Sequence, residues 1–319
     1  MKKPPYDFWL HWYLSERCYM TCSYCGEWQQ GDLAYKPVRT IDIPRLISTL
    51  DRTGLVFRIS FTGGGEPFLV PNLTEACLEL TNRHYVSFNT NLAELLVRGF
   101  LERVDPSRVV EIHASCHLKS LERRKLMDRF VDNCLLCQRR NIPLTIVEVG
   151  YPPLLAEVEK YKAFFQSKGL NLHFGVFCGN WNGKNYPQAY TEAELIAFGL
   201  NDTSRVTHAP NSAGRRIICN ASCTTAIARP NGSIAPCDDV EGDMGNLYRE
   251  IRIRKHIMLC PAAWCTCPRY EYDRALYLET LRRDRLYVSL LRPMLRINAK
   301  LNNRSWYVRF KRLCRAARN

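Results

Sequence analysis

The sequence predicts an α/β protein, built from a partial (β/α)6 barrel, a small cysteine-rich module and a basic helical tail. From residue 8 to about residue 177, short apolar runs alternate with longer amphipathic stretches. The 15 cysteines include two tight clusters, one near each end of the chain. Strands that alternate with helices form βαβ units and a parallel sheet, whose ligands lie at the carboxyl ends of the strands.

Each element of the predicted barrel has its own signal. The apolar runs are short enough for buried strands, which we expect at residues 8–14, 55–62, 84–90, 108–115, 143–149 and 171–177. The stretches between them have helical spacing, and we expect helices at residues 44–53, 72–83, 92–103, 121–140 and 155–168. Six such strands make an open or partly closed barrel, which we assign to residues 1–178.

The chain changes character after the barrel. Glycine, asparagine and proline crowd the start of residues 179–215, which we interpret as a linker or active-site loop. A compact cysteine-rich module follows at residues 216–270. Residues 271–319 have an amphipathic, helical pattern with an expected break at Pro293.

Composition places the chain in the cytoplasm. It is 46% hydrophobic, as folded proteins are, and no run approaches the ~20 apolar residues of a transmembrane helix. The N-terminus lacks the small-residue cleavage site of a signal peptide. Disulfides rarely persist in a reducing compartment, so clustered cysteines there indicate metal ligands.

The first cysteine cluster, Cys18-x3-Cys22-x2-Cys25, directly follows the first predicted strand. Four thiolates saturate a 4Fe–4S cube, so three local ones leave one iron open for another ligand. A zinc knuckle, or a chance spacing, is the competing interpretation of these three residues taken alone.

Two further features accompany this cluster. Tyr24 places an aromatic residue immediately before Cys25, and the segment Thr62–Pro67, TGGGEP, follows the second predicted strand. With these features the sequence resembles the radical S-adenosylmethionine (radical SAM) superfamily, whose signature is CxxxCx-aromatic-C followed by a GGEP motif. The resemblance extends over residues 8–177.

The resemblance implies a set of cofactor-binding residues. Cys18, Cys22 and Cys25 would hold a catalytic 4Fe–4S cluster, and S-adenosylmethionine would bind beside it. Glu66 would hold the amino group of the methionine moiety. The other expected contacts to this cofactor are Tyr24, Gly64, Gly65, Asn89, Ser115 and Glu148. A flavodoxin-like or ferredoxin-like partner would supply the electrons.

The second cluster frames a predicted hairpin. Cys219 and Cys237 flank a tight turn at Gly232, and Cys260, Cys265 and Cys267 follow. This segment resembles the twitch module, a shortened SPASM domain, and implies one auxiliary 4Fe–4S cluster. Which four of these five residues and Cys223 bind the cluster stays open, and a zinc ribbon is the competing interpretation.

The basic tail suggests a surface partner. Residues 282–319 hold 12 Lys or Arg residues and one acidic residue, Asp284. Such a segment suits an anionic membrane surface, which would place the protein at the inner face of the membrane. Nucleic acid is the weaker alternative, and a solvated helix face the simplest one.

The expected function is therefore radical chemistry on S-adenosylmethionine. We expect a two-electron oxidation of a carbohydrate, a cyclitol or a lipid-linked glycan. A peptide-modifying maturase, an RNA-modifying radical SAM enzyme, and a non-enzymatic zinc-ribbon or electron-transfer protein remain open alternatives.

Overall fold

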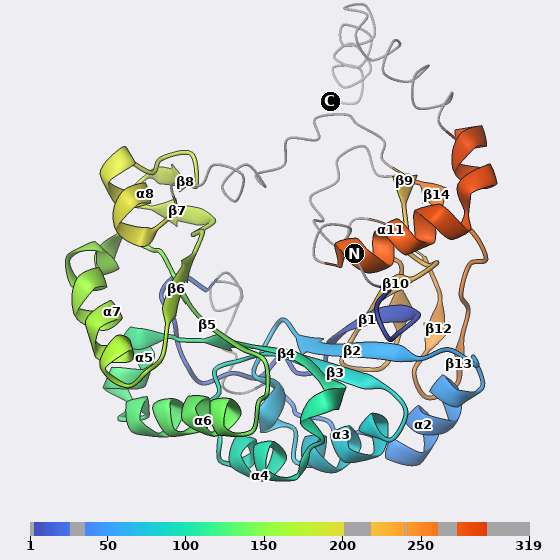
Figure 1. Cartoon of the computed structure of the whole chain (residues 1–319), viewed down its shortest axis with the longest axis horizontal. Helices are drawn as coiled ribbons and strands as arrows, with labels where there is room; N and C mark the ends of the chain where they lie inside the picture. Colours follow the sequence, from blue (N-terminus) through green and yellow to red (C-terminus); the bar gives the residue numbers. More distant parts are fainter. Residues whose placement is uncertain are drawn as a thin grey trace, which may run out of the picture.

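The computed structural model describes residues 3–25, 36–200, 218–238, 240, 242–260 and 273–291. Its centre is an eight-stranded sheet with the order β11-β10-β1-β2-β3-β4-β5-β6 (Figure 1). The six strands of the predicted barrel are β1 (Phe8–Tyr13), β2 (Phe57–Thr62), β3 (Tyr85–Thr90), β4 (Val109–Ser115), β5 (Leu144–Val149) and β6 (Leu172–Gly175). They pair in parallel and in chain order, which confirms the predicted α/β fold class.

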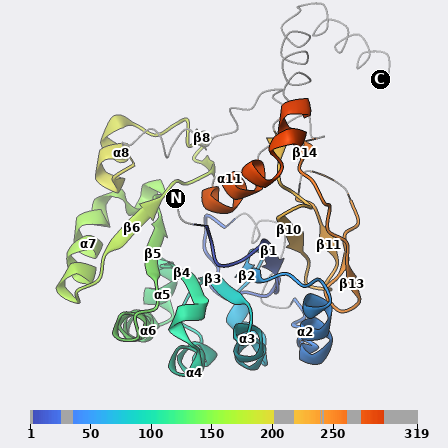
Figure 2. The same cartoon turned by 45° about the vertical axis from the view of Figure 1, so that its right-hand side comes forward.

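Helices cover one face of this sheet (Figures 1 and 2). They are α2 (Ile43–Asp51), α3 (Leu73–Thr81), α4 (Leu95–Arg103), α6 (Met127–Arg139) and α7 (Val158–Ser167). Alternate strand residues point toward them, so large apolar side chains such as Phe57, Phe61 and Phe88 are fully buried in one core. The opposite face carries mostly polar side chains along β2, β3 and β4.

Two predicted helices differ from expectation. The stretch 121–140 forms two helices, α5 (Leu118–Arg123) and α6, because Lys125 adopts a left-handed φ of 57° that ends the first. The stretch 155–168 begins as a 3₁₀ helix, η4 (Pro152–Glu157), before α7 starts.

Residues 179–200, expected as a linker or loop, contain regular structure. A hairpin forms from β7 (Gly179–Trp181) and β8 (Lys184–Tyr186), and the short helix α8 (Glu192–Phe198) follows. Thr191 begins α8 with a capping box, in which its side chain and that of Glu194 bond to each other's backbone N–H.

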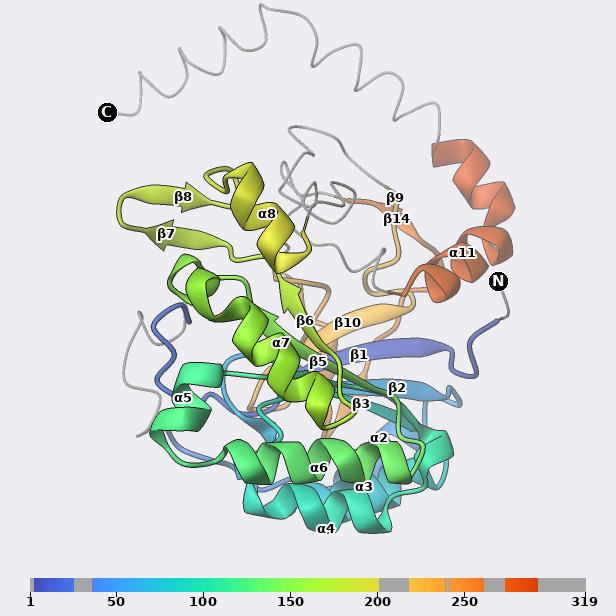
Figure 3. The same ribbon diagram turned by 60° about the vertical axis from the view of Figure 1, so that its left-hand side comes forward.

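The sheet continues into the cysteine-rich segment. The predicted hairpin around Gly232 forms from β10 (Thr225–Ala228) and β11 (Ile234–Ala235), and β10 pairs in parallel with β1. Smaller pairs join β12 (Gly245–Asn246) to β13 (Glu250–Ile251), and β9 (Ile218–Cys219) to β14 (Met258–Leu259). Figure 3 shows β10 lying beside β1, and in the sheet order only β11 lies beyond β10.

The last described element is α11 (Arg274–Arg283), which packs Leu276 against Tyr6 and Trp9 of the N-terminal segment. Within the described ranges, no helix is both long and apolar enough to cross a membrane. Most of the predicted basic tail, from residue 292 onward, lies outside the described residues.

Candidate active site

The cysteine loop leaves the carboxyl end of β1 and carries Cys18, Cys22 and Cys25. All three are thiols outside any disulfide, and Cys22 is buried. The backbone N–H of Cys25 donates to the carbonyl of Cys22 (3.1 Å), which closes the loop locally. Parallel strands bring their carboxyl ends to one edge, so the loops after β2, β4 and β5 surround this loop.

The glycine loop after β2 is bound directly to the cysteine loop. Gly65 N–H donates to the carbonyl of Ser15 (2.7 Å), and Glu66 N–H donates to that of Arg17 (2.8 Å). A Cβ added at Gly65 would lie 2.1 Å from the Arg17 oxygen, and one at Gly64 would lie 3.0 Å from the Ser15 oxygen. The predicted glycines therefore allow one backbone to approach another, just ahead of Cys18.

Glu66 is buried beneath these two loops. Its carboxylate accepts hydrogen bonds from Phe68 N–H (3.0 Å), Thr90 Oγ1 (2.7 Å) and Asn91 N–H (2.7 Å). Burial raises the pKa of Glu66 to about 7. A carboxylate offers about four acceptor positions, so one remains beside these three bonds. Its expected contact to an ammonium group stays a prediction.

The carboxylate of Glu148 in β5 accepts hydrogen bonds that hold the cysteine loop in place. Its Oε1 accepts from the Tyr24 hydroxyl (2.8 Å) and from Val149 N–H (2.6 Å), and its Oε2 accepts from Leu118 N–H (2.7 Å). Burial raises the pKa of Glu148 to about 7. Tyr24 and Glu148, both expected at the cofactor, thus bind each other, and the carboxylate holds the loop to β5 and α5.

Three further residues, which the predicted cofactor site did not include, hold the same loop. His117 Nδ1 lies 2.9 Å from the Tyr24 hydroxyl, and burial lowers the pKa of His117 to about 4. Ser23 pairs with the Tyr151 hydroxyl at 2.9 Å. Ser120 Oγ lies 3.6 Å from Cys22 Sγ. Such partners become neighbours only when the fold brings the carboxyl ends of β4 and β5 to the same edge of the sheet as that of β1.

Asn89 and Ser115 lie at the carboxyl ends of β3 and β4, on the face away from the helices. Asn89 donates from Nδ2 to Thr62 Oγ1 (2.9 Å), so it joins the ends of β2 and β3. Ser115 is half-buried and sits opposite Val147 in the sheet register. Their expected contacts to the cofactor stay predictions, at positions that suit them.

The residues present fit a 4Fe–4S cluster at the cysteine loop. Burial raises the pKa of Cys18 to about 12 and that of Cys22 to about 11, so these thiols are poor free nucleophiles. Among the described residues, no three His, Cys, Asp or Glu side chains converge as ligands of one metal ion. Thiolates of a cube bind different irons, so they need not converge on one point.

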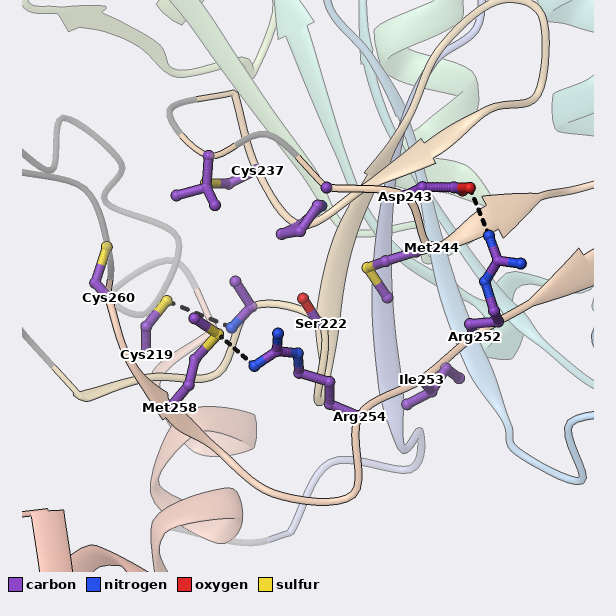
Figure 4. Close-up of a pocket in the computed structure, with 14 residues that line it drawn as sticks. Cys219, Ser222, Cys237, Asp243, Met244, Arg252, Ile253, Arg254, Met258 and Cys260 are labelled. Atoms are coloured by element: carbon purple, nitrogen blue, oxygen red, sulfur yellow. Dashed lines mark hydrogen bonds and ion pairs between the residues drawn. The ribbon is translucent and has the colours of Figure 1, made fainter.

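A second site lies in the cysteine-rich segment, where a cavity of about 480 Å³ is lined by Cys219, Cys237 and Cys260 (Figure 4). The three side chains come from separate segments and gather at one end. At the other end Arg252 pairs with Asp243 at 2.6 Å. Three thiols in one cavity of this size are a donor set that fits a cluster.

Of the other three cysteines in this segment, the structure describes only Cys223. Cys223 does not line the cavity; it is buried elsewhere and accepts a hydrogen bond from Arg283 (2.9 Å). Cys265 and Cys267 lie outside the described residues, and their expected role stays a prediction.

The comparisons bear on the fold. No family model and no curated protein matches the chain. Polyhistidine-tagged anSMEcpe with bound AdoMet is similar in structure, with a TM-score of 0.52 and 18% identity over 78% of this chain and 76% of that one. Native anSMEcpe with bound AdoMet and Cp18Cys peptide gives 0.51 and 17%, over 78% and 79%. The chain has the radical SAM fold.

The radical SAM fold gives the site its orientation. The Cys18–Cys25 loop, the glycine loop, and the ends of β3, β4 and β5 meet at the carboxyl edge of the sheet, where parallel α/β folds bind ligands. The similar structures hold AdoMet, which is S-adenosylmethionine. The likeness concerns the fold alone, so this chain's chemistry rests on its own residues.

Proposed function

We propose that this chain cleaves S-adenosylmethionine reductively on a 4Fe–4S cluster held by Cys18, Cys22 and Cys25. The observation that supports this most strongly is the pair of backbone hydrogen bonds that joins the cysteine loop to Gly65 and Glu66. Such a cluster, when bound and reduced, supplies the electron that releases methionine and a 5′-deoxyadenosyl radical. The protein positions the reactants and excludes water.

The chain's own residues have separable tasks in this proposal. The three thiols bind iron, and Tyr24 with Glu148 fixes the loop that carries Cys22 and Cys25. Glu66, buried beside this loop, offers its remaining acceptor position to the ammonium group of the methionine moiety. Asn89 and Ser115 present polar groups at the same edge. A flavodoxin-like or ferredoxin-like protein would supply electrons.

We also propose an auxiliary 4Fe–4S cluster in the cavity of Cys219, Cys237 and Cys260, with Cys265 or Cys267 as a further ligand. An electron acceptor near the substrate would make the overall reaction a two-electron oxidation. The polar face of the sheet suits a hydroxyl-rich substrate, so a carbohydrate, a cyclitol or a lipid-linked glycan is the substrate class that we favour.

Peptide modification is the second candidate. One of the similar structures, anSMEcpe, holds a peptide together with AdoMet. A peptide substrate for this chain would be a short precursor, and it would increase formation of 5′-deoxyadenosine where sugars and cyclitols do not.

The test uses the full chain, purified and reconstituted with iron and sulfide without oxygen. With dithionite and S-adenosylmethionine, we expect a brown protein that forms 5′-deoxyadenosine. The triple variant Cys18→Ala, Cys22→Ala, Cys25→Ala should form none. Cys178→Ser, at an exposed cysteine outside both sites, is the matched control and should keep the activity. A wild-type chain that binds zinc, or forms no 5′-deoxyadenosine, would refute the proposal.

A further inference from the structure

The face of the sheet away from the helices carries a row of polar side chains, of which only part is assigned to the cofactor. On β4 these are Glu111, His113 and Ser115, which alternate with the buried Ile112 and Ala114. Ser115 lies at the carboxyl edge with the candidate active site. His113 precedes Ser115 by two residues, so it lies about 7 Å back from that edge on the same face.

A β-bulge in β4 sets this orientation. Val86 of β3 is opposite Val109, but the next residue, Ser87, is opposite Glu111, so Val110 is an extra residue in β4. Val110 packs against the cluster of Tyr6, Trp9 and Leu276 on this face. If β4 alternated regularly from the inward-facing Val109 with Val110 opposite Ser87, Glu111 and His113 would face the helices. Bulges of this kind are frequent beside active sites.

Arg58 of β2 holds the Glu111 side chain in place through an ion pair. The Arg58 side chain is only 6% exposed; it pairs with Glu111 and lies 3.6 Å from Asp273 Oδ2. Its guanidinium carbon lies 4.5 Å from the centre of the Trp9 ring. Arg58 bonds to Oε1 of Glu111, which leaves Oε2 available to another partner.

That partner is His113, whose Nε2 lies 3.0 Å from Glu111 Oε2. The hydrogen bond from His113, together with Arg58, lowers the pKa of Glu111 to about 2, so this carboxylate is ionised and can only accept. Nε2 of a neutral His113 therefore carries the proton, and Nδ1 carries a lone pair. The His113 side chain is 42% exposed, so solvent or a ligand reaches it.

We propose that His113, oriented by Glu111, binds a hydroxyl group of a polyol substrate and accepts its proton. In that step the O–H bond breaks, the proton moves to Nδ1, and the electron pair stays on the substrate oxygen. Glu111 then stabilises the imidazolium, in the manner of a carboxylate–histidine pair. The sheet neighbours of His113 are Asn89 and Thr145, whose polar side chains suit further hydroxyls. This inference rests on the proposed function, whose substrate it narrows to polyols.

The test measures access to His113 in the reconstituted chain, with myo-inositol as the polyol probe. Diethyl pyrocarbonate attacks the unprotonated imidazole nitrogen, and mass spectrometry follows the rate at each histidine. We expect tens of millimolar myo-inositol to slow the reaction of His113 by roughly threefold or more, as occupancy of a millimolar site requires. His256 is the matched internal control, since it is 45% exposed and pairs with Asp284 outside this face. Its rate should not change.

The variant Glu111→Gln tests the orienting role. The amide of glutamine can donate as well as accept, so it no longer fixes His113 with its proton on Nε2. Protection by myo-inositol should then fall below about twofold. Equal protection of His113 and His256, or none at either, would overturn the inference. Formation of 5′-deoxyadenosine is measured on the same preparation. Its absence refutes the proposed function, whereas missing protection in a chain that forms it refutes only the role of His113.

Discussion

The Tyr24 hydroxyl donates a hydrogen bond of 2.8 Å to Glu148 Oε1, joining residues 124 positions apart in the chain. Tyr24 precedes the third cysteine of the loop, and Glu148 is 1% exposed in β5. The position of the cysteine loop is therefore fixed by a strand on the far side of β2, β3 and β4 in the sheet order. The contact links the stability of the fold to the geometry of the loop.

Tyr24→Phe should lower the free energy of unfolding by about 1–3 kcal/mol, because it removes a hydrogen bond to a buried carboxylate. It should also reduce the iron retained after reconstitution. Urea denaturation and iron analysis measure the two effects. Tyr85→Phe is the control and should change stability by less than about 0.5 kcal/mol. Equal behaviour of the two variants would contradict the role given to Tyr24.

The contribution of Glu148 to stability should fall as the pH rises from 5 to 8. The pKa of Glu148 is raised from 4.5 to about 7, so the folded state binds its proton more tightly than the unfolded state does. Its stabilising contribution is complete below about pH 4.5 and is lost as the pH passes 7. The loss is on the order of 3 kcal/mol. The difference in stability between pH 5 and pH 8, measured by urea denaturation, should change by about this amount in Glu148→Gln, and an unchanged difference would be evidence against this assignment.

Gly65→Ala should separate the glycine loop from the cysteine loop, since its Cβ would lie 2.1 Å from the Arg17 oxygen. We expect a loss of stability of about 1–3 kcal/mol and a lower iron content. Gly99→Ala in α4 is the matched control, because its Cβ meets nothing within 4 Å. That change should stabilise the helix by about 0.5–1 kcal/mol. The argument fails if both variants are equally stable and bind equal iron.

Alanine at Cys219, Cys237 or Cys260 should remove the auxiliary cluster and leave the first one. Iron content should fall from about eight to about four atoms per chain, as two four-iron clusters require. Cys223→Ser should keep the full content, because Cys223 lies outside the cavity. Iron analysis and electron paramagnetic resonance of the reduced protein measure this. Loss of iron in the Cys223 variant alone would assign the cluster to another site.

The sequence predicts the order of strands well, since each apolar run, such as residues 84–90, becomes a strand of the parallel sheet. It also predicts the cysteine and glycine loops, whose spacing is local. It does not predict that Glu148 holds Tyr24, because that partnership needs β5 to lie in its place in the sheet. Nor does it predict which face of the sheet carries the Glu111 side chain. The extra residue Val110 shifts the alternation of side chains along β4, and a sequence pattern assumes that this alternation is regular.

The pairing of β10 with β1 has a consequence for synthesis. β1 is made long before β10 and acquires this neighbour only after Ala228 has been made, so one edge of β1 stays open while the intervening residues are synthesised. Phe8, Leu10 and Trp12 alternate along that strand, as in segments that add to foreign strands. A chain stopped at residue 200 would keep that edge and is expected to aggregate. The cysteine-rich segment thus has two roles: its strand β10 covers the open edge of β1, and its cysteines form a candidate cluster site.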